Sequence, residues 1–432
     1  MFILAVLSAG LAFAGEPTFT RDVAPILYRS CAGCHHAGDI GPMALMSYKE
    51  ARPYAAAIRA AVLSRKMPPW KADPRYGHWA NDPRLSDAEI ATIKAWADGA
   101  KLEGKASDLP AAPEFPDGWN IGKPDLVVAV PKFTLGEGKT DEYSSVDIPT
   151  NFAEDRWIVA AELRPGNRKV VHHAHVFVKE AAAGKPAAKD PAADYANWLI
   201  VREGTLHWMR PDAPVIDDGC SVDDNGMLPG RKLAQMGNLL SSYLPGRPAV
   251  AFPEGTARKI PAGAKLNFQI HYARTTGKPE TDVTSVGFIF AKKPPERVLY
   301  YSYLSNQMFR IPAGDPDHKV TGCHTFDREL TITSLTPHMH LRGKAMRYVA
   351  KYPDGREETL LYVPAYDFNW QFTYHAKEGI RIPAGTRIEV TAEFDNSANN
   401  RYNPDPKSAV RWGSASEMEM MDGWMEYIEA RP

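Results

Sequence analysis

Apolar residues follow two different spacings along the chain, and the change between them falls near residue 105. Before that point they recur every three or four positions, the spacing of one helix face. Two Ser-x-x-Glu segments, Ser47–Glu50 and Ser86–Glu89, precede such runs and predict helix starts with a capping box. Met67-Pro68-Pro69 and Gly99 are the stops that the pattern predicts. These residues therefore indicate a small helical module.

Beyond the Pro-rich segment Leu109–Pro116, short runs alternate apolar and polar residues. Trp157–Leu163 and Lys265–His271 are two of them, and turn residues separate the runs, as in a β-sandwich. The tetrapeptide Ile-Pro-Ala-Gly occurs three times, starting at Ile260, Ile311 and Ile382. One interpretation is a turn favoured before strands. The other, which we prefer because each half also carries a histidine cluster, is a tandem pair of β-modules.

Composition excludes several classes of function. Charged residues make up 24% of the 432 residues and the formal net charge is -1, which argues against nucleic acid or an anionic membrane as a partner. Residues 1–14 are apolar and end in small residues, as in a signal peptide. No later run is long enough to span a bilayer. We therefore expect an exported protein, periplasmic or secreted, with no membrane span.

The four cysteines fall into two pairs. Cys31-Ala32-Gly33-Cys34-His35 is the C-x-x-C-H signal for one covalent haem c, held by two thioethers and ligated by His35. A zinc site would need further Cys or His at knuckle spacing, which the segment lacks. Cys220 and Cys323 remain, and in an oxidising compartment they favour a disulfide over two buried thiols.

A methionine is the expected second iron ligand, because Met/His coordination suits electron transfer. Met67 follows a predicted helix and precedes two prolines that fix its turn. Met43 and Met46 are competitors and His78 is a weaker one, while the simplest alternative makes Met67 a packing residue. With Lys66–Trp70, the segment looks like a small bacterial cytochrome c domain.

One histidine cluster is simple. His338 and His340 lie two residues apart, so on a strand both project from one face and can bind one ion. A thioether from the segment Met418–Met421 would complete a site that stabilises Cu(I).

The other cluster is His172-His173-Ala174-His175, with His271 downstream. Strand alternation pairs His173 with His175, whereas His172 and His173 can bind one ion together only at a strand end or a β-bulge. His271 would complete a three-histidine site. The alternative is that one or two of these histidines are hydrogen-bonded core residues.

Three segments, Val171–Phe177, Phe268–Tyr272 and His338–Lys344, resemble in this order the motifs of the copper type II, ascorbate-dependent monooxygenases. This family includes peptidylglycine α-hydroxylating monooxygenase and dopamine β-hydroxylase. The resemblance covers about Leu126 to the C-terminus and implies two jelly-roll-like domains, each holding one copper ion.

The resemblance also implies the two ligand sets. His172, His173 and His271 would bind the electron-supplying copper, and His338, His340 and Met420 the catalytic, oxygen-activating copper, with Met418 and Met421 as alternatives to Met420. Peptide-amidating members have an Arg where this chain has Thr336 and a Tyr where it has Trp424. Peptide amidation is therefore not expected.

The expected fold is multidomain, with a small all-α cytochrome c domain followed by two all-β jelly-roll-like sandwich domains. The expected boundaries are a signal peptide over 1–14, the cytochrome c domain over 15–104, a Pro-rich linker over 105–124, and β-domains over 125–295 and 296–432.

The expected function is a copper-dependent monooxygenase that hydroxylates a C–H bond of a small organic substrate with O2. Its cofactors would be one haem c and two copper ions, and its electrons would come from a periplasmic donor. The alternative is a non-catalytic electron-transfer or copper-binding protein that uses the same ligands. A substrate pocket beside an open copper site would favour the enzyme.

Overall fold

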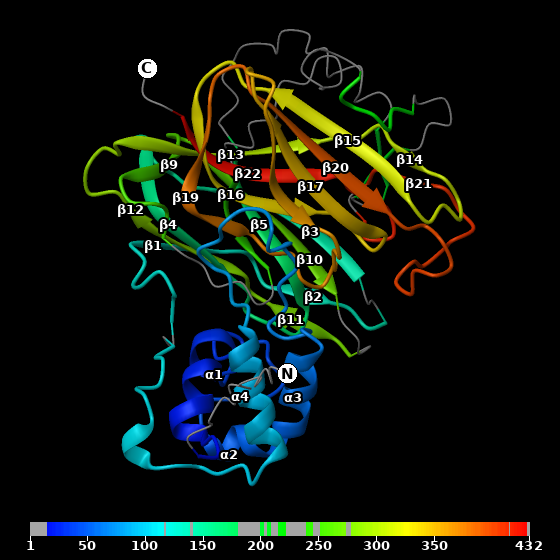
Figure 1. Cartoon of the computed structure of the whole chain (residues 1–432). Helices are drawn as coiled ribbons and strands as arrows, with labels where there is room; N and C mark the ends of the chain where they lie inside the picture. The colour runs from blue at the N-terminus through cyan, green and yellow to red at the C-terminus, as the bar shows by residue number, and fades with distance from the viewer. Residues whose placement is uncertain are drawn as a thin grey trace, which may run out of the picture. The chain divides into compact units, whose positions relative to one another are not determined.

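The computed structural model describes residues 15–115, 118–138, 141–179, 199–202, 205–208, 215–221, 239–244, 251–273, 278–413 and 415–429. They belong to two compact units, coloured in Figure 1 from blue at the N-terminus to red at the C-terminus. The first unit contains residues 15–70 and 83–115, and the second contains residues 71–82 and the described residues from 118 onward.

Short helices build the first unit. They are α1 (Ala24–Ser30), α2 (Tyr48–Ala51), α3 (Ala55–Leu63) and α4 (Asp87–Asp98), with a π-turn at Phe19–Val23 and 3-10 turns at Arg52–Tyr54 and Ala106–Asp108. The predicted capping box of Ser86 and Glu89 starts α4, and Ser47 caps α2. The apolar faces meet around the fully buried Trp96.

The predicted fold class is wrong in its first part, because no substantial all-α cytochrome c domain is present among the described residues. The helices cover 7, 4, 9 and 12 residues, and far more of the described residues lie in strands than in helices. The helix expected between Ser47 and Met67 is divided, because a 3-10 turn at Arg52–Tyr54, which contains Pro53, separates α2 from α3. Residues 31–47, with three glycines, form turns and bends instead of a helix.

The second unit is built on an eight-stranded sheet with the order β1-β12-β4-β9-β13-β22-β16-β19. Parallel pairing of β9 with β13 joins strands from the two halves of the chain, so the two predicted sandwiches share this sheet. Its strands are β1 (Leu126–Ala129), β4 (Arg156–Arg164), β9 (Thr256–Ile260), β12 (Ser285–Phe290), β13 (Arg297–Ser305), β16 (Leu330–His338), β19 (Tyr374–Ile382) and β22 (Asp422–Glu429).

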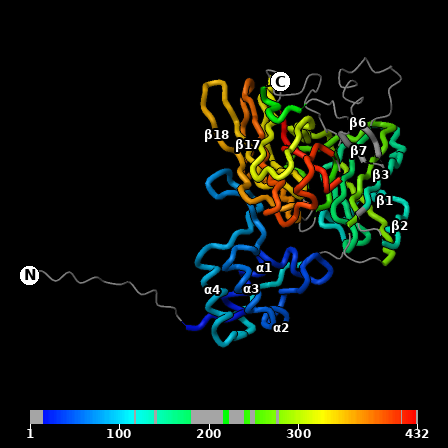
Figure 2. The backbone as a smooth tube through the Cα atoms, turned by 90° about the vertical axis from the view of Figure 1, so that its right-hand side faces the viewer, coloured from blue at the N-terminus to red at the C-terminus, as the bar shows by residue number. Residues whose placement is uncertain are grey.

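Two four-stranded sheets complete the sandwiches, in the orders β3-β10-β5-β8 and β15-β20-β17-β18. Figure 2 shows the strands of the second half, yellow to red, beside those of the first half. The bounds are β3 (Asp141–Pro149), β5 (Val171–Lys179), β8 (Leu239–Tyr243), β10 (Lys265–Ala273), β15 (His318–Thr325), β17 (Gly343–Lys351), β18 (Glu357–Val363) and β20 (Arg387–Phe394). Three pairs are smaller: β2 (Phe133–Leu135) with β11 (Glu280–Asp282), β6 (Leu199–Arg202) with β7 (Thr205–Trp208), and β14 (Arg310–Ile311) with β21 (Val410–Arg411).

Each sandwich has an apolar interior. In the first, Leu266, Phe268 and Ile270 of β10 are buried in one cluster with Phe288 of β12. In the second, a Cβ atom on Gly423 of β22 would lie within 3.2 Å of the side chains of Val390 and Tyr348, so the two sheets are in close contact. The histidine clusters lie on strand faces that point away from these interiors.

The predicted disulfide is confirmed: Cys220 is bonded to Cys323 of β15. It ties the segment 215–221 to β15, where Asp218 also bridges Thr321. Structural disulfides persist in oxidising compartments, so the bond fits an exported protein. Among the described residues, no helix combines the length and apolar character that crossing a bilayer requires.

Candidate metal centres

A β-bulge places the upstream histidines on one side of their sheet. In the pairing of β5 with β10, His271 lies opposite His173 and Tyr272 lies opposite Val171, so His172 is the extra residue. Alternation alone would turn His172 to the opposite face from His173. The bulge removes that restriction, because the extra residue breaks the alternation. It is the irregularity that joint binding by His172 and His173 requires.

Three imidazole nitrogens converge at this bulge. His173 Nδ1 lies 3.1 Å from His172 Nδ1 and 3.4 Å from His271 Nδ1. Ligand atoms of the three histidines all lie within 4.8 Å of one another. Three nitrogens bound about 2.0 Å from one ion are themselves about 3.3 Å apart, so the spacing fits a metal centre. Burial, reinforced by the other histidines, lowers the pKa of His173, which favours the neutral, ligating form.

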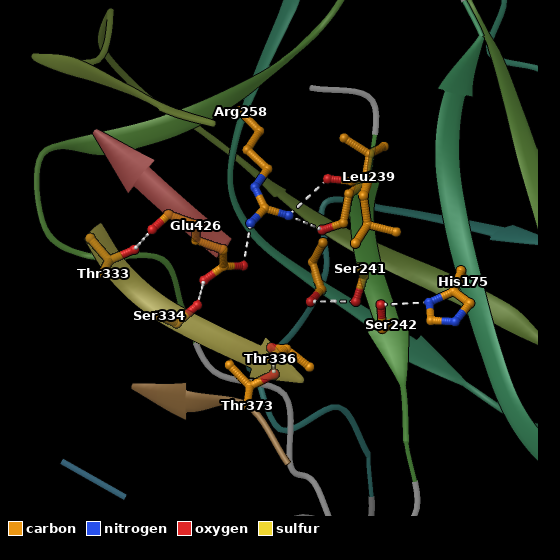
Figure 3. Close-up of polar contacts among 12 residues, drawn as sticks. His175, Leu239, Ser241, Ser242, Arg258, Thr333, Ser334, Thr336, Thr373 and Glu426 are labelled. Atoms are coloured by element: carbon orange, nitrogen blue, oxygen red, sulfur yellow. Dashed lines mark hydrogen bonds and ion pairs between the residues drawn. The ribbon is translucent and has the colours of Figure 1, made fainter. Parts of the chain in front are cut away.

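His175 is engaged elsewhere. Its Nδ1 lies 2.8 Å from the hydroxyl oxygen of Ser242 on β8 (Figure 3). Its ring centroid lies 5.4 Å from that of Trp424. Of the two candidate ligand sets, this geometry favours His172, His173 and His271 over the pair His173 and His175.

The second cluster lies where β16 ends. His338 is its last residue, and His340 follows two positions later. His338 Nδ1 lies 2.7 Å from Gln371 Oε1, and His340 Nδ1 lies 3.2 Å from the Met418 carbonyl oxygen. These contacts orient the rings through Nδ1, which leaves Nε2 as the natural metal-binding atom of each. Burial lowers the pKa of both histidines, so both are suited to ligation as neutral imidazoles.

Strand register separates the candidate methionines. The pairing of β16 with β22 ends at His338 opposite Asp422, and continued for two more residues it would place Met420 opposite His340. Opposite residues of an antiparallel pair project from the same face. Met421 projects from the other face: it is fully buried and packs beside Gly322 of β15. The register therefore favours Met420 over Met421 as the sulfur ligand, while Met418 offers its carbonyl group to His340.

A buried carboxylate supports this cluster, and the sequence pattern did not reveal it. Glu419 is fully buried and accepts the backbone N–H groups of His340 at 2.8 Å and Arg342 at 2.6 Å. Burial raises the pKa of Glu419 to about 8. Arg342, also buried, donates through Nε to Asn396 at 2.7 Å. Glu419, the residue before Met420, thus holds the turn after His338 through the backbone N–H groups of His340 and Arg342.

A loop between β18 and β19 contacts both clusters. Phe368 stacks on His172 with a centroid distance of 5.1 Å and meets His340 edge-on at 5.9 Å. Gln371, which holds His338, donates to the Phe368 carbonyl group at 3.1 Å. The Tyr366 hydroxyl group bonds both the N–H and the carbonyl group of Met339. Long-range contacts of this kind leave no spacing signal in the sequence.

The C-x-x-C-H motif follows α1. The Cys34 and His35 N–H groups donate to the Cys31 carbonyl group at 3.1 and 2.9 Å, which folds the motif into a tight turn. Neither cysteine forms a disulfide. Burial raises the pKa of Cys31 to about 12 and that of Cys34 to about 11, so neither is a reactive thiolate at neutral pH.

His35 is held as an axial haem ligand would be. Its Nδ1 lies 3.1 Å from the Met43 carbonyl oxygen, which leaves Nε2 for iron. A Cβ atom on Gly41 would lie 2.8 Å from His35 Nδ1, so only glycine leaves room for the ring. The donor set fits a haem c. Met67 lies after α3 in the same compact unit as His35, whereas His78 belongs to the other unit.

A cavity of about 360 Å³ lies in the β-unit. Its lining comes from both halves of the chain: β4, β8, β9 and the segment before β9 on one side, and β13, β16, β19 and β22 on the other. Ser242, which contacts His175, is one of the lining residues. Tyr301, another, has its ring centroid 5.5 Å from that of Trp424, and Trp424 lies 5.4 Å from His338. The Trp424 indole therefore stands between the cavity and His338.

No protein-family model matches the chain, and no curated protein matches it. Among solved structures, the chain is similar to PNGase F, a glycosylasparaginase from Flavobacterium meningosepticum. The two share 9% identity, the similarity covers 71% of this chain and 97% of that chain, and the TM-score is 0.25. A similarity at this level carries no argument about fold or function.

Proposed function

We propose that the chain is a copper-dependent monooxygenase that hydroxylates a C–H bond of a small organic substrate. One observation carries the proposal: two unlike ligand clusters, three nitrogens on a bulge and two histidines that contact the methionine-rich segment Met418–Met421, lie in one β-unit and share the Phe368 ring. Imidazole suits copper in general, and a thioether specifically stabilises Cu(I). Metal ions that served only to stabilise the fold would not require two clusters with different ligand types.

In the proposed reaction, one oxygen atom of O2 enters the C–H bond, and the other leaves as water after uptake of two electrons and two protons. Copper at the two clusters would supply one-electron storage at each and the activation of O2. The chain's own residues prepare the sites: Gln371 and the Met418 carbonyl group fix the rings of His338 and His340. The Phe368 ring stacks on His172 and the Trp424 ring lies 5.4 Å from His338, so an aromatic side chain flanks each cluster.

We assign one haem c to Cys31, Cys34 and His35, with Met67 as the second axial ligand. The support is the C-x-x-C-H turn together with the anchoring of His35 at Nδ1. A haem with Met/His ligation would pass electrons from a periplasmic donor toward the copper clusters. The export of such a protein to the periplasm also agrees with its disulfide.

Oxygen consumption tests the catalytic proposal. The haem-containing, copper-loaded protein is supplied with reductant and a panel of small organic molecules in an oxygen electrode. We expect consumption that depends on one class of molecule and that His338→Ala abolishes, while His175→Ala keeps most of it. Two bound coppers without substrate-dependent consumption would identify a non-catalytic electron-transfer or copper-binding protein instead.

The haem assignment has its own test. Acid-acetone extraction should leave the haem on the protein, because thioethers resist the solvent. A Met-ligated ferric haem also has a weak sulfur-to-iron band in the near infrared, which Met67→Ala should remove. Haem that leaves with the solvent would overturn the covalent attachment. Survival of the near-infrared band in Met67→Ala would overturn the assignment of Met67 as the ligand.

A further inference from the structure

One tyrosine lies against the upstream histidines. Tyr143 of β3 pairs with His271 of β10, and its ring stacks on the His271 imidazole with a centroid distance of 4.1 Å and an interplanar angle of 3°. The same ring meets His173 edge-on at 6.5 Å. A flat ring that is packed face to face cannot turn without its partner, so Tyr143 restricts the plane of the His271 imidazole. That plane decides where the Nδ1 atom of His271 points.

The hydroxyl group of Tyr143 reaches a distant part of the chain. Its oxygen lies 3.1 Å from the hydroxyl oxygen of Ser416, which is 273 residues further along, and either hydroxyl group can donate. Ser416 is buried, so its hydroxyl group depends on partners within the protein. Tyr143 therefore connects β3, in the first half of the chain, to the segment that precedes Met418 in the second half.

That segment is a turn which holds a downstream histidine. The Met418 N–H group donates to the Ala415 carbonyl group at 2.9 Å and closes the turn around Ser416. The Met418 carbonyl oxygen lies 3.2 Å from His340 Nδ1. A continuous series of contacts thus leads from His271, through Tyr143 and the Ser416 turn, to His340. Packed side chains and hydrogen bonds in such a series carry energetic coupling between two sites.

We propose that Tyr143 and Ser416 are positioning residues that make the two clusters bind copper cooperatively, an inference that rests on the proposed function because it needs two copper sites. A metal ion at the upstream cluster fixes the His271 ring. Through the ring stack and the hydroxyl contact, this favours the turn that orients His340. Linkage makes the effect reciprocal, so copper at the downstream cluster favours the upstream one equally.

Cooperative loading has a consequence for the proposed reaction. That reaction draws one electron from each copper, so a chain with a single copper holds only one of the two electrons that the reduction of O2 requires. A chain in which the first copper favours the second is either empty or fully loaded over most copper concentrations. The contact between Tyr143 and Ser416 therefore keeps half-loaded chains rare.

Anaerobic titration of the haem-containing chain with Cu(I), against a chromophoric Cu(I) chelator, measures the coupling. The Cu(I) affinity of the downstream cluster is determined in the native chain and in His172→Ala, whose upstream cluster lacks a ligand. X-ray absorption identifies the downstream copper by its sulfur neighbour. The ratio of the two affinities is the coupling factor, and we expect it to be about fivefold or more in the native chain. A factor of one would overturn the proposal.

Two conservative substitutions make the decisive comparison. Tyr143→Phe keeps the stacked ring and Ser416→Ala keeps the turn, but each removes one hydroxyl group of the contact. Each should lower the coupling factor about two- to fivefold, and the double variant should lower it no further than either alone. Any direct effect of His172→Ala through its stack on Phe368 is the same in all these backgrounds and cancels.

Tyr300→Phe is the matched control, because Tyr300 is also half-buried and its ring stacks on Tyr427 with a centroid distance of 5.5 Å. It should leave the coupling factor unchanged. A factor that neither Tyr143→Phe nor Ser416→Ala lowers, or that only one of them lowers, would overturn the proposal, since the contact needs both hydroxyl groups. An equal loss in Tyr300→Phe would overturn it as well.

The coupling and the catalytic proposal fail separately. Copper binding is measured without O2 or substrate, so coupling can be found in a chain that consumes no oxygen, and only the catalytic proposal is then lost. If the two coppers bind independently while substrate-dependent oxygen consumption is found, only the coupling is lost. A native chain that binds a single copper would overturn both.

Discussion

Which nitrogen of each histidine is engaged decides what each cluster can bind. Three Nδ1 atoms converge at His172, His173 and His271, whereas the Nδ1 of His175 contacts Ser242. In the downstream cluster, Nδ1 of His338 and His340 is held by the protein and Nε2 remains. The two sites therefore present different nitrogens as well as different ligand types.

This distinction predicts unequal effects for two neighbouring substitutions. His172→Ala should lower the copper content from two ions per chain to one, because it removes one of three converging ligands. His175→Ala should retain both coppers, since it breaks only the contact with Ser242. Elemental analysis after dialysis measures both variants. The reverse pattern would restore the pair His173 and His175 as the ligand set.

The methionines offer a second comparison. Met420→Ala should weaken Cu(I) binding at the downstream site with little effect on stability, because Met420 is half-buried and the register of β16 and β22, continued two residues, would place it opposite His340. Met421→Ala should leave Cu(I) binding intact and destabilise the fold by about 2–5 kcal/mol, because it empties a fully buried position. Competition with a Cu(I) chelator and urea unfolding supply the two readouts. Weakened Cu(I) binding in Met421→Ala alone would contradict the register argument.

At the scale of elements, the loop between β18 and β19 links the two clusters. Phe368 contacts His172 and His340, and aromatic contacts of this kind contribute about 0.5–1.5 kcal/mol each. Phe368→Ala should therefore weaken copper binding at both sites, by about two- to tenfold each. Phe372→Ala, which removes a ring stacked on Trp370, is the control and should change neither affinity. An effect confined to one site would show that the loop does not couple them.

The start of β15 carries a pH-dependent contact. His318 lies 3.3 Å from Asp217 and 3.2 Å from Asp315, and these carboxylates raise the pKa of His318 above its usual value of 6.5. A raised pKa means that the stabilisation is complete below pH 6.5 and is lost as the pH rises through the folded-state value. The free energy of unfolding should therefore fall from pH 6 to pH 8.5 more in the native chain than in His318→Gln. If the free energies of unfolding of the native chain and of His318→Gln, measured in urea, fall in parallel over this pH range, His318 does not contribute to the pH dependence.

Short sequence patterns predicted the nearby helix starts and strands well. They carry no information about which distant strands pair with one another. The serine caps of α2 and α4, the strands that carry His271 and His338, and the Cys220–Cys323 disulfide all follow from neighbouring residue types or from counting. The bulge at His172 depends on which strand pairs with β5, so alternation within β5 alone cannot reveal it. The helix that starts at Ser86 ends before Gly99 as expected, whereas the one expected between Ser47 and Met67 is interrupted at Arg52–Tyr54, because apolar spacing persists through a proline that breaks a helix.

At the scale of the whole molecule, the shared eight-stranded sheet explains why one site can draw on both halves of the chain. Parallel pairing of β9 with β13 brings Arg258 from the first half to Glu426 from the second. Neither residue belongs to a motif, and their separation of well over a hundred residues hides the pairing from any sequence pattern. The cavity and the ion pair were for this reason not predicted.

We propose that the chain holds two unlike copper sites, and X-ray absorption of the Cu(I)-loaded protein can distinguish two such sites from one. We expect two coppers per chain and an average shell of nitrogen with roughly one sulfur for every two coppers, because only the downstream ligand set includes a thioether. That sulfur should vanish in Met420→Ala. A single bound copper, or two coppers whose spectra contain no sulfur, would contradict the account.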